Sequence, residues 1–114
     1  MSDCIFCKIV NKEIPANIVY EDDKILVFHD LSPVAPVHVL VIPKIHIDSL
    51  NTLDESSSNT IGYLMSKVKE IAKKLGVDKS GFRIISNTGD EGGQTVGHVH
   101  FHLVGGRQMK WPPG

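Results

Sequence analysis

The alternation of apolar and polar positions predicts one long helix and one short one. Apolar residues at three- and four-residue steps between residues 60 and 75 form a single stripe, which is typical of an amphipathic helix. We expect Asp54, or one of the serines at positions 56–58, to cap the start of this helix, and Gly76 to end it. Residues 5–10 predict a short helical turn near the N-terminus.

Short runs rich in apolar residues predict the strands. Residues 18–20 and 25–28 are two such runs separated by a polar turn, a pattern typical of a hairpin. Residues 37–42 are apolar at nearly every position, so we expect an inner strand buried on both faces. Residues 82–86 and 98–104 complete the set. About five strands in a mainly antiparallel sheet, with one long helix, define an α+β fold, and 114 residues favour a single domain over residues 1–114.

Composition and charge narrow the classes of protein. Apolar residues make up 41% of the chain and charged residues 22%, as in an ordinary globular protein. The formal net charge of −1 gives no basic field that would attract nucleic acid or anionic lipid. The N-terminus lacks a secretory signal, and no apolar stretch approaches the roughly 20 residues of a membrane helix. We therefore expect a cytoplasmic or nuclear protein that binds neither nucleic acid nor membranes.

The most informative motif is a row of three histidines at alternate positions, His98, His100 and His102. In a strand they would share one face and stand about 6.5–7 Å apart. A polar strand face does not require three imidazoles, so the row calls for a function. Imidazole ligates zinc, acts as a nucleophile and transfers protons near neutral pH. The row therefore indicates either a metal site or a site for an anion.

A glycine-rich loop directly before this row favours the anion. Residues 87–97 contain four glycines, which allow backbone N–H groups to converge on phosphate oxygens. Asn87 adds an amide and Thr95 a hydroxyl. Most glycine-rich loops are merely turns, but one that leads into three histidines predicts a phosphate-binding site.

These segments together resemble the histidine-triad (HIT) family. Residues 98–104 match the alternating histidine and apolar signature of that family, and the likeness runs from about Cys4 to Gly114. The ending, residues 105–114, resembles the Hint branch, adenosine phosphoramidases that work as homodimers. The resemblance implies a HIT-like fold and a hydrolase that cleaves purine nucleoside phosphoramidates to a nucleoside monophosphate and an amine. It also places Trp111 in a tail that reaches towards the partner's active site.

The resemblance implies a catalytic role for four histidines. His100 corresponds to the nucleophile, which attacks the α-phosphorus and forms a nucleotidyl-histidine that water hydrolyses. We expect His102 to bond phosphate oxygens or to assist proton transfer, and His98 completes the triad. His38 resembles a supporting histidine that helps to fix the ring orientations; the alternative for His38 is a satisfied core histidine.

Further residues resemble the nucleotide-binding site of the family. Asp30 resembles the carboxylate that accepts hydrogen bonds from both ribose hydroxyls. The walls of the base pocket correspond to Ile5, Phe6, Ile9, Phe28, His29, Leu31 and Leu40. Beside His100 and His102, the phosphate contacts are expected from Asn87, Gly93, Gln94, Thr95 and Val96. Plain core packing explains any single apolar wall residue equally well, and such a pocket would discriminate poorly between adenine and guanine.

The only two cysteines, Cys4 and Cys7, indicate half of a metal site or a redox pair. Metal-binding members of the family show an arrangement in which His46 and His98 would complete a Cys₂His₂ set. Such a closed tetrahedral set is typical of structural zinc. The alternative is a pair of ordinary thiols.

Two rival functions stay open. A dinucleoside polyphosphate hydrolase or nucleotidyl transferase of the same family would differ in its leaving group. A nucleotide-binding scaffold that regulates partners would turn over little substrate. A zinc-finger-like nucleic-acid binder is disfavoured, because no clustered basic or aromatic surface accompanies the cysteines.

Overall fold

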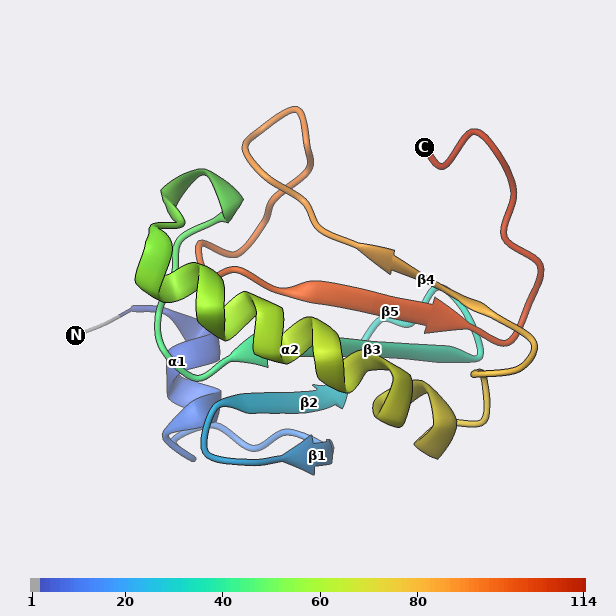
Figure 1. The fold of residues 1–114 in the computed structure, drawn as a ribbon, viewed down its shortest axis with the longest axis horizontal. Coiled ribbons are helices and arrows are strands. Elements are labelled where there is room, and N and C mark those ends of the chain that lie inside the picture. The colour runs from blue at the N-terminus through green and yellow to red at the C-terminus, as the bar shows by residue number, and fades with distance from the viewer. Residues whose placement is uncertain (1–2) are drawn as a thin grey trace.

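The computed structural model describes residues 3–114 and contains one sheet with a long helix on one face (Figure 1). The helices are α1 (Ile5–Val10) and α2 (Glu55–Lys74), with a 3-10 turn, η1 (Leu50–Thr52). The strands are β1 (Ile18–Glu21), β2 (Ile25–His29), β3 (Val37–Pro43), β4 (Phe82–Ile85) and β5 (Phe101–Gly105). Every neighbouring pair in the order β1-β2-β3-β5-β4 is antiparallel. The predicted α+β fold is confirmed.

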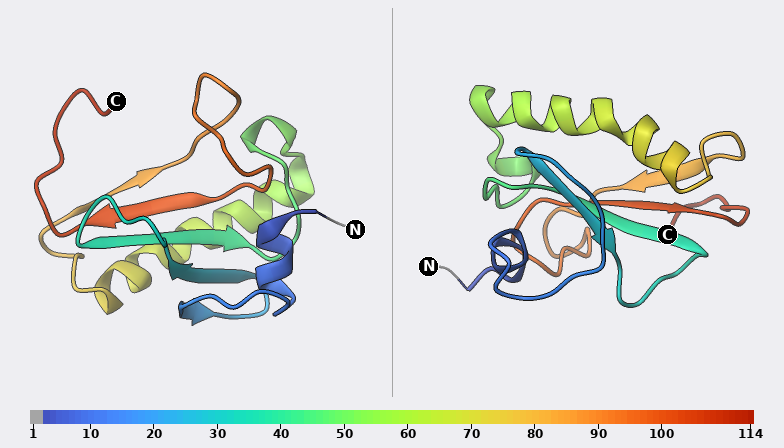
Figure 2. Two further views of the ribbon diagram at one scale, coloured as in Figure 1. Left: turned by 180° about the vertical axis from the view of Figure 1, so that it is seen from behind. Right: turned by 90° about the horizontal axis from the view of Figure 1, so that it is seen from below.

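Helices α1 and α2 lie on opposite faces of the sheet (Figure 2). Because side chains alternate along a strand, β3 contributes to the core on both faces. Val39 and Val41 pack in the core beneath α2, while Leu40 and Ile42 pack in a smaller core against α1. The inner strand that the apolar run predicts is therefore buried on both sides.

Helix α2 begins earlier than its apolar stripe predicts. Asp54 caps the helix, because its carboxylate accepts a hydrogen bond from the Ser57 N–H at 2.8 Å, and the Ser57 hydroxyl accepts one from the Asp54 N–H at 2.9 Å. This first turn is polar, so the periodicity does not extend into it. The helix ends where predicted, with Gly76 in the left-handed conformation at a φ of 77°. No helix in the described part of the chain is long and apolar enough to cross a membrane.

The strand predicted over residues 98–104 begins later than expected. β3 and β5 pair from Val41 opposite Phe101 to Val37 opposite Gly105. Two pairs further along, the position opposite residue 99 would be Pro43, which has no N–H to donate to the ladder. The Val99 N–H instead donates to the carbonyl of Ile47 at 2.6 Å. His98 and His100 therefore precede the strand.

Candidate functional site

The three histidines of the triad lie together beside α1, although only His102 belongs to β5. The ring centroids of His100 and His102 are 5.2 Å apart. Phe6 of α1 packs edge-on against the rings of His100 and His98. Its ring centroid lies 5.1 Å from that of His100 and 5.8 Å from that of His98. The sequence thus predicts the gathering of the three imidazoles, although not the backbone that achieves it.

The His100 ring has one possible neutral tautomer in its hydrogen-bonding environment. Its Nδ1 lies 2.8 Å from the carbonyl oxygen of His98, and a carbonyl only accepts hydrogen bonds. Nδ1 therefore carries the proton and donates. The lone pair of neutral His100 is then on Nε2, the atom that a nucleophilic imidazole uses.

The orientation of His102 is determined through His38, which is buried. The N–H of Val34 donates to Nδ1 of His38 at 3.1 Å, so neutral His38 carries its proton on Nε2. That Nε2 lies 2.9 Å from Nδ1 of His102 and donates to it. His102 consequently carries its own proton on Nε2. The neighbouring rings of His100 and His102 thus have different tautomers. Nε2 of His100 has a lone pair, whereas Nε2 of His102 carries a proton.

Burial favours the neutral form of His102. Desolvation lowers the pKa of His102, the nearby His100 and His38 rings lower it further, and only Asp30 opposes them. Neutral His102 is a hydrogen-bond donor through Nε2–H and a poor acid. A phosphoryl oxygen placed there would therefore receive a hydrogen bond.

A pocket of about 210 Å³ lies between α1 and the strand ends of the same face. Its lining includes all eight residues expected at the base and the ribose: Ile5, Phe6, Ile9, Phe28, His29, Asp30, Leu31 and Leu40. Leu40 is paired with His102 across the sheet, and Phe6 contacts His100, so one end of the pocket lies next to the triad. Asp30 stands at this end, with one carboxylate oxygen 3.4 Å from Nε2 of His38.

The glycine-rich loop uses several of its N–H groups internally. The N–H of Gly93 donates to Asp90, that of Gln94 to Gly89, and that of Gly89 to the Gln94 side chain. The Asn87 side-chain amide donates to the Gly92 carbonyl at 2.6 Å. Glycine is required at position 92, where a Cβ would lie 2.2 Å from a backbone oxygen of Thr88.

The backbone N–H groups of the loop that are expected to converge on phosphate are therefore only partly engaged within the loop itself. Within residues 3–114, the N–H groups of Gly89, Gly93 and Gln94 have partners inside the loop, whereas no hydrogen bond is formed by those of Thr95 and Val96. The glycines shape the loop, and its last residues before the triad retain donors for an anion.

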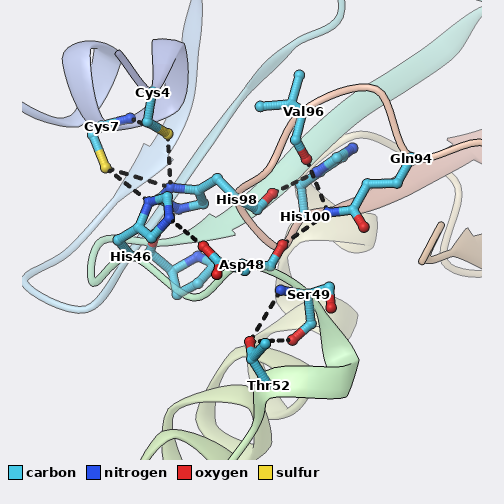
Figure 3. A network of polar contacts seen from close by, with 11 residues as sticks. Cys4, Cys7, His46, Asp48, Ser49, Thr52, Gln94, Val96, His98 and His100 are labelled. Atoms are coloured by element: carbon cyan, nitrogen blue, oxygen red, sulfur yellow. Dashed lines mark hydrogen bonds and ion pairs between the residues drawn. The ribbon is translucent and has the colours of Figure 1, made fainter. Parts of the chain in front are cut away.

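Cys4, Cys7, His46 and His98 form a compact cluster at the N-terminus of α1 (Figure 3). Nδ1 of His98 lies 3.3 Å from Sγ of Cys4 and 3.6 Å from Sγ of Cys7, and Nδ1 of His46 lies 3.3 Å from Sγ of Cys7. In a tetrahedral site with ordinary Zn–S and Zn–N bond lengths, sulfur and nitrogen ligands are about 3.5 Å apart. The four side chains thus fit a zinc ion.

The outer contacts of both histidines support the same conclusion. Nε2 of His98 donates to the carbonyl of Pro43 at 2.9 Å, and Nε2 of His46 donates to the Asp48 carboxylate at 2.7 Å. Each ring therefore directs an unprotonated Nδ1 at the sulfurs, which is the arrangement that metal-binding histidines show. Desolvation lowers the pKa of the buried His98, favouring the neutral form that a metal requires.

A second group of potential ligands, Asp30, His38 and His102, does not suit a metal. Nε2 of His38, the atom nearest the other two, carries a proton because Val34 occupies Nδ1. A protonated nitrogen has no lone pair to donate. In this group His38 and His102 are joined by a hydrogen bond, and one carboxylate oxygen of Asp30 lies 3.4 Å from Nε2 of His38.

Sequence reasoning missed part of the site. Asp48 contacts a cluster histidine and also the glycine loop, through its carbonyl and Gln94 Nε2 at 2.8 Å. Pro15, Ala16 and Asn17 complete the pocket lining. None of these belongs to a motif, and their positions follow from the chain path alone. Trp111 is 82% exposed. The C-terminal tail runs beyond the β4 edge of the sheet, away from α1 (Figure 1).

Comparisons with known proteins agree with this geometry. The model of the HIT domain matches residues 11–109. A 14 kDa zinc-binding protein of Brassica juncea is 50% identical over 98% of this chain and 100% of its own. The crystal structure of a HIT family hydrolase from Legionella pneumophila superposes with a TM-score of 0.95 at 46% identity, covering 98% of this chain and 100% of that one.

A more distant solved structure, a histidine triad nucleotide-binding protein from Candida albicans, has a TM-score of 0.81 at 36% identity and covers 89% of this chain and 73% of that one. The family match spans most of the chain, including the triad, the glycine loop and the pocket strands. This chain therefore belongs to the HIT family.

Proposed function

We propose that the protein is a hydrolase that cleaves the P–N bond of purine nucleoside phosphoramidates through a nucleotidyl-histidine at His100. The observation that carries the proposal is the bond from Nδ1–H of His100 to the His98 carbonyl, which places the lone pair on Nε2. The pocket for a nucleoside ends beside this ring. The Legionella relative is named a hydrolase, which supports the proposed hydrolysis, and the Candida relative is named a nucleotide-binding protein, which supports the proposed nucleotide substrate.

In the first step Nε2 of His100 attacks the α-phosphorus. A bond forms between Nε2 and phosphorus, and the P–N bond of the substrate breaks. Its electron pair leaves with the nitrogen, which takes a proton from water, because an amide anion is a very poor leaving group. The imidazole becomes cationic on phosphorylation, and the His98 carbonyl stabilises this charge through the 2.8 Å bond to Nδ1.

His102 stabilises the phosphoryl group during the same step. Its Nε2–H, held by the His38 hydrogen bond, donates to an oxygen on which negative charge accumulates. In the second step water attacks phosphorus, the bond to Nε2 breaks, and a proton returns to solvent. His100 is regenerated and the nucleoside monophosphate leaves.

The nucleoside binds along the pocket between α1 and the sheet. The base lies against Ile5, Phe6 and Phe28, and the Asp30 carboxylate accepts from the ribose hydroxyls. Asn87, Thr95 and Val96 contact the phosphate from the loop side, with Gly93 and Gln94 shaping that loop. The lining gives few polar groups to read the base edge, so adenine and guanine are both accepted.

Zinc is the second part of the proposal. Cys4, Cys7, His46 and His98 would hold one structural Zn²⁺, as their mutual distances and the outer contacts of the two histidines favour. When bound, the ion would crosslink α1 to the segment before β5. Metal analysis of protein purified without a histidine tag tests this: we expect about one zinc per chain, and close to none in Cys4→Ser/Cys7→Ser. His38→Ala, outside the cluster, should keep its zinc; a zinc-free wild type contradicts the assignment.

Turnover measurements test the activity. We expect an adenosine 5′-phosphoramidate to be hydrolysed much faster than diadenosine polyphosphates, whereas the reverse order would favour the polyphosphate hydrolase. His100→Ala should abolish hydrolysis and retain binding of AMP, because the pocket residues are unchanged. A wild type that binds AMP without any turnover would favour a regulatory scaffold.

The resemblance further supports a homodimer in the cytoplasm or nucleus, with Trp111 beside the partner's site. Trp111 is 82% exposed within its own chain, as expected of a side chain that contacts another protomer. Light scattering should give twice the chain mass. Trp111→Ala should alter the preference among leaving amines, while AMP affinity stays the same; a monomer with unaltered preference contradicts the assembly.

A further inference from the structure

Residues 46–48, which we call the bracing segment, belong neither to the triad nor to the glycine loop, yet they contact both. Nδ1 of His46 lies 3.3 Å from Sγ of Cys7 in the metal cluster. The next residue, the buried Ile47, accepts a hydrogen bond from the Val99 N–H at 2.6 Å, in the middle of the triad segment. Two neighbouring residues thus connect the cluster and the triad.

The third residue of the bracing segment extends the connection to the glycine loop (Figure 3). The Asp48 carboxylate accepts from Nε2 of His46 at 2.7 Å, and its carbonyl accepts from Nε2 of Gln94 at 2.8 Å. The same Nε2 donates to the Val96 carbonyl at 3.0 Å, while the side-chain oxygen of Gln94 accepts from the Gly89 N–H at 3.1 Å. The Gln94 side chain therefore links two parts of the loop to each other and also links the loop to the bracing segment.

We propose that the bracing segment couples the metal cluster to the phosphate loop, so that zinc and the nucleotide phosphate each increase the protein's affinity for the other. Zinc would restrict the orientation of the His46 ring, and the hydrogen bond from His46 would in turn restrict Asp48. Because Gln94 donates to the Asp48 carbonyl, the loop would then be held in the form that binds phosphate. A ligand that orders the loop favours the same arrangement of His46, since coupling between two sites is reciprocal. The inference rests on the proposed function of the loop and the cluster.

Helix α1 offers a competing route, because it carries both cysteines and the base-pocket residues Ile5 and Phe6. However, α1 is also held by apolar contacts of Phe6 and Ile9 with β2 and β3, which do not depend on a metal. A route through α1 would couple zinc to the base, whereas the bracing segment couples zinc to the phosphate. The two routes therefore differ in which ligand responds to zinc.

Calorimetric titration of the zinc-loaded and zinc-free protein with AMP and with adenosine separates the routes. We expect zinc to tighten AMP binding about fivefold or more, and adenosine binding by less than about twofold. AMP should tighten zinc binding, measured against a competing chelator, by the same factor. Equal AMP affinities with and without zinc, or equal shifts for AMP and adenosine, overturn the inference. Loss of all AMP binding by the zinc-loaded protein would instead refute the proposed function.

The variant Gln94→Met tests the connection itself, because methionine has a similar shape and lacks the amide. We expect this variant to bind zinc as the wild type does in the absence of nucleotide, and its AMP affinity to be the same with and without zinc. Gln108→Met makes the same exchange at an exposed site, where within residues 3–114 the amide donates only to the neighbouring Met109 carbonyl, and this variant should retain the coupling. Coupling that persists in Gln94→Met overturns the route.

Hydrogen exchange of the wild type provides a readout that does not depend on a variant. The N–H groups of Gly89, Gly93 and Gln94 are hydrogen-bonded within the loop, so added zinc should slow their exchange. Exchange in residues 87–97 that is the same with and without zinc overturns the coupling.

Discussion

His38 and His102 share a hydrogen bond of 2.9 Å whose direction is determined by a third group. The Val34 N–H occupies Nδ1 of His38, which leaves the proton on Nε2 and makes His38 the donor. His102 must then present an N–H, rather than a lone pair, to the reaction. The buried His38 thereby sets the tautomer of its neighbour His102.

Replacement of His38 should therefore lower the rate more than the affinity. In His38→Ala, His102 can adopt either tautomer, and we expect kcat to fall about tenfold to a hundredfold, with AMP affinity within about threefold of the wild type. His38→Gln retains an amide donor, so we expect its kcat to fall less than that of His38→Ala. Long-range ¹H–¹⁵N spectra should show Nε2–H of His102 in the wild type and a tautomer mixture in His38→Ala. A single unchanged tautomer in His38→Ala would contradict the account.

Asp30 should be responsible for recognition of ribose. Its Oδ1 accepts from the Ser32 N–H at 2.7 Å, which orients the carboxylate, and it lines the pocket beside the triad. A charged hydrogen bond is worth about 1.5 kcal/mol or more, so the wild type should bind AMP roughly tenfold more tightly than 2′-deoxy-AMP. Asp30→Asn keeps the shape and an acceptor for Ser32, and should bind both ligands alike. A variant that still prefers the ribonucleotide would show that the hydroxyls are recognised elsewhere.

The fold was largely predictable because its signals are local. The apolar run of β3 and the stripe of α2 each predict their element, and the alternate spacing of the triad predicts that the rings gather. The start of α2 at Glu55 was not predictable from periodicity, since Asp54 and Ser57 form it by capping. The start of β5 was not predictable from the alternation, because it depends on the pairing with β3, which ends at Val41 opposite Phe101 while the Val99 N–H donates to Ile47.

The candidate site, like the fold, was predictable only in part. The seven expected wall residues and the ribose residue Asp30 all line one pocket, because the resemblance transfers side chains position by position. The loop was only partly predictable, since glycine content does not reveal that Gly93 and Gln94 use their N–H groups internally. Asp48 carried no signal, because its role arises from the contacts with His46 and Gln94 across separate segments.

Asp22 should make stability sensitive to acid. Burial raises the pKa of Asp22, but hydrogen bonds from the hydroxyls of Tyr63 at 2.6 Å and Tyr20 at 2.9 Å, and from two backbone N–H groups, outweigh it and hold the pKa well below its usual range. A depressed carboxyl pKa stabilises the fold above the unfolded value of about 3.9, and this stability is lost as the pH falls towards the folded pKa.

Urea unfolding between pH 7 and pH 2.5 measures this contribution. Asp22→Asn should be less stable than the wild type at pH 7, with a shallower loss of stability below about pH 4. The exposed neighbour allows a matched control, Asp23→Asn, which should follow the wild type. Parallel pH profiles for Asp22→Asn and the wild type would exclude this role.

Ser86 should be a position where removal of a polar group stabilises the protein. Its hydroxyl oxygen is buried and has no hydrogen-bond partner within the described residues. An unsatisfied buried group costs about 1–3 kcal/mol, so Ser86→Ala should raise the free energy of unfolding by about 1 kcal/mol. Ser66→Ala is the contrasting control, since the Ser66 hydroxyl is exposed and bonded to the Tyr63 carbonyl at 2.6 Å. A loss of stability in Ser86→Ala would show that the hydroxyl has a partner, such as a buried water.

The covalent intermediate is the central claim, and mass spectrometry measures it most directly. Enzyme mixed with an adenosine phosphoramidate is quenched within milliseconds by denaturant at alkaline pH, since the P–N bond to histidine is labile in acid. We predict an adenylyl group on the peptide that contains the triad, located on His100 by fragmentation and absent in His100→Ala. Turnover with no adduct, or an adduct on another residue, would contradict the account.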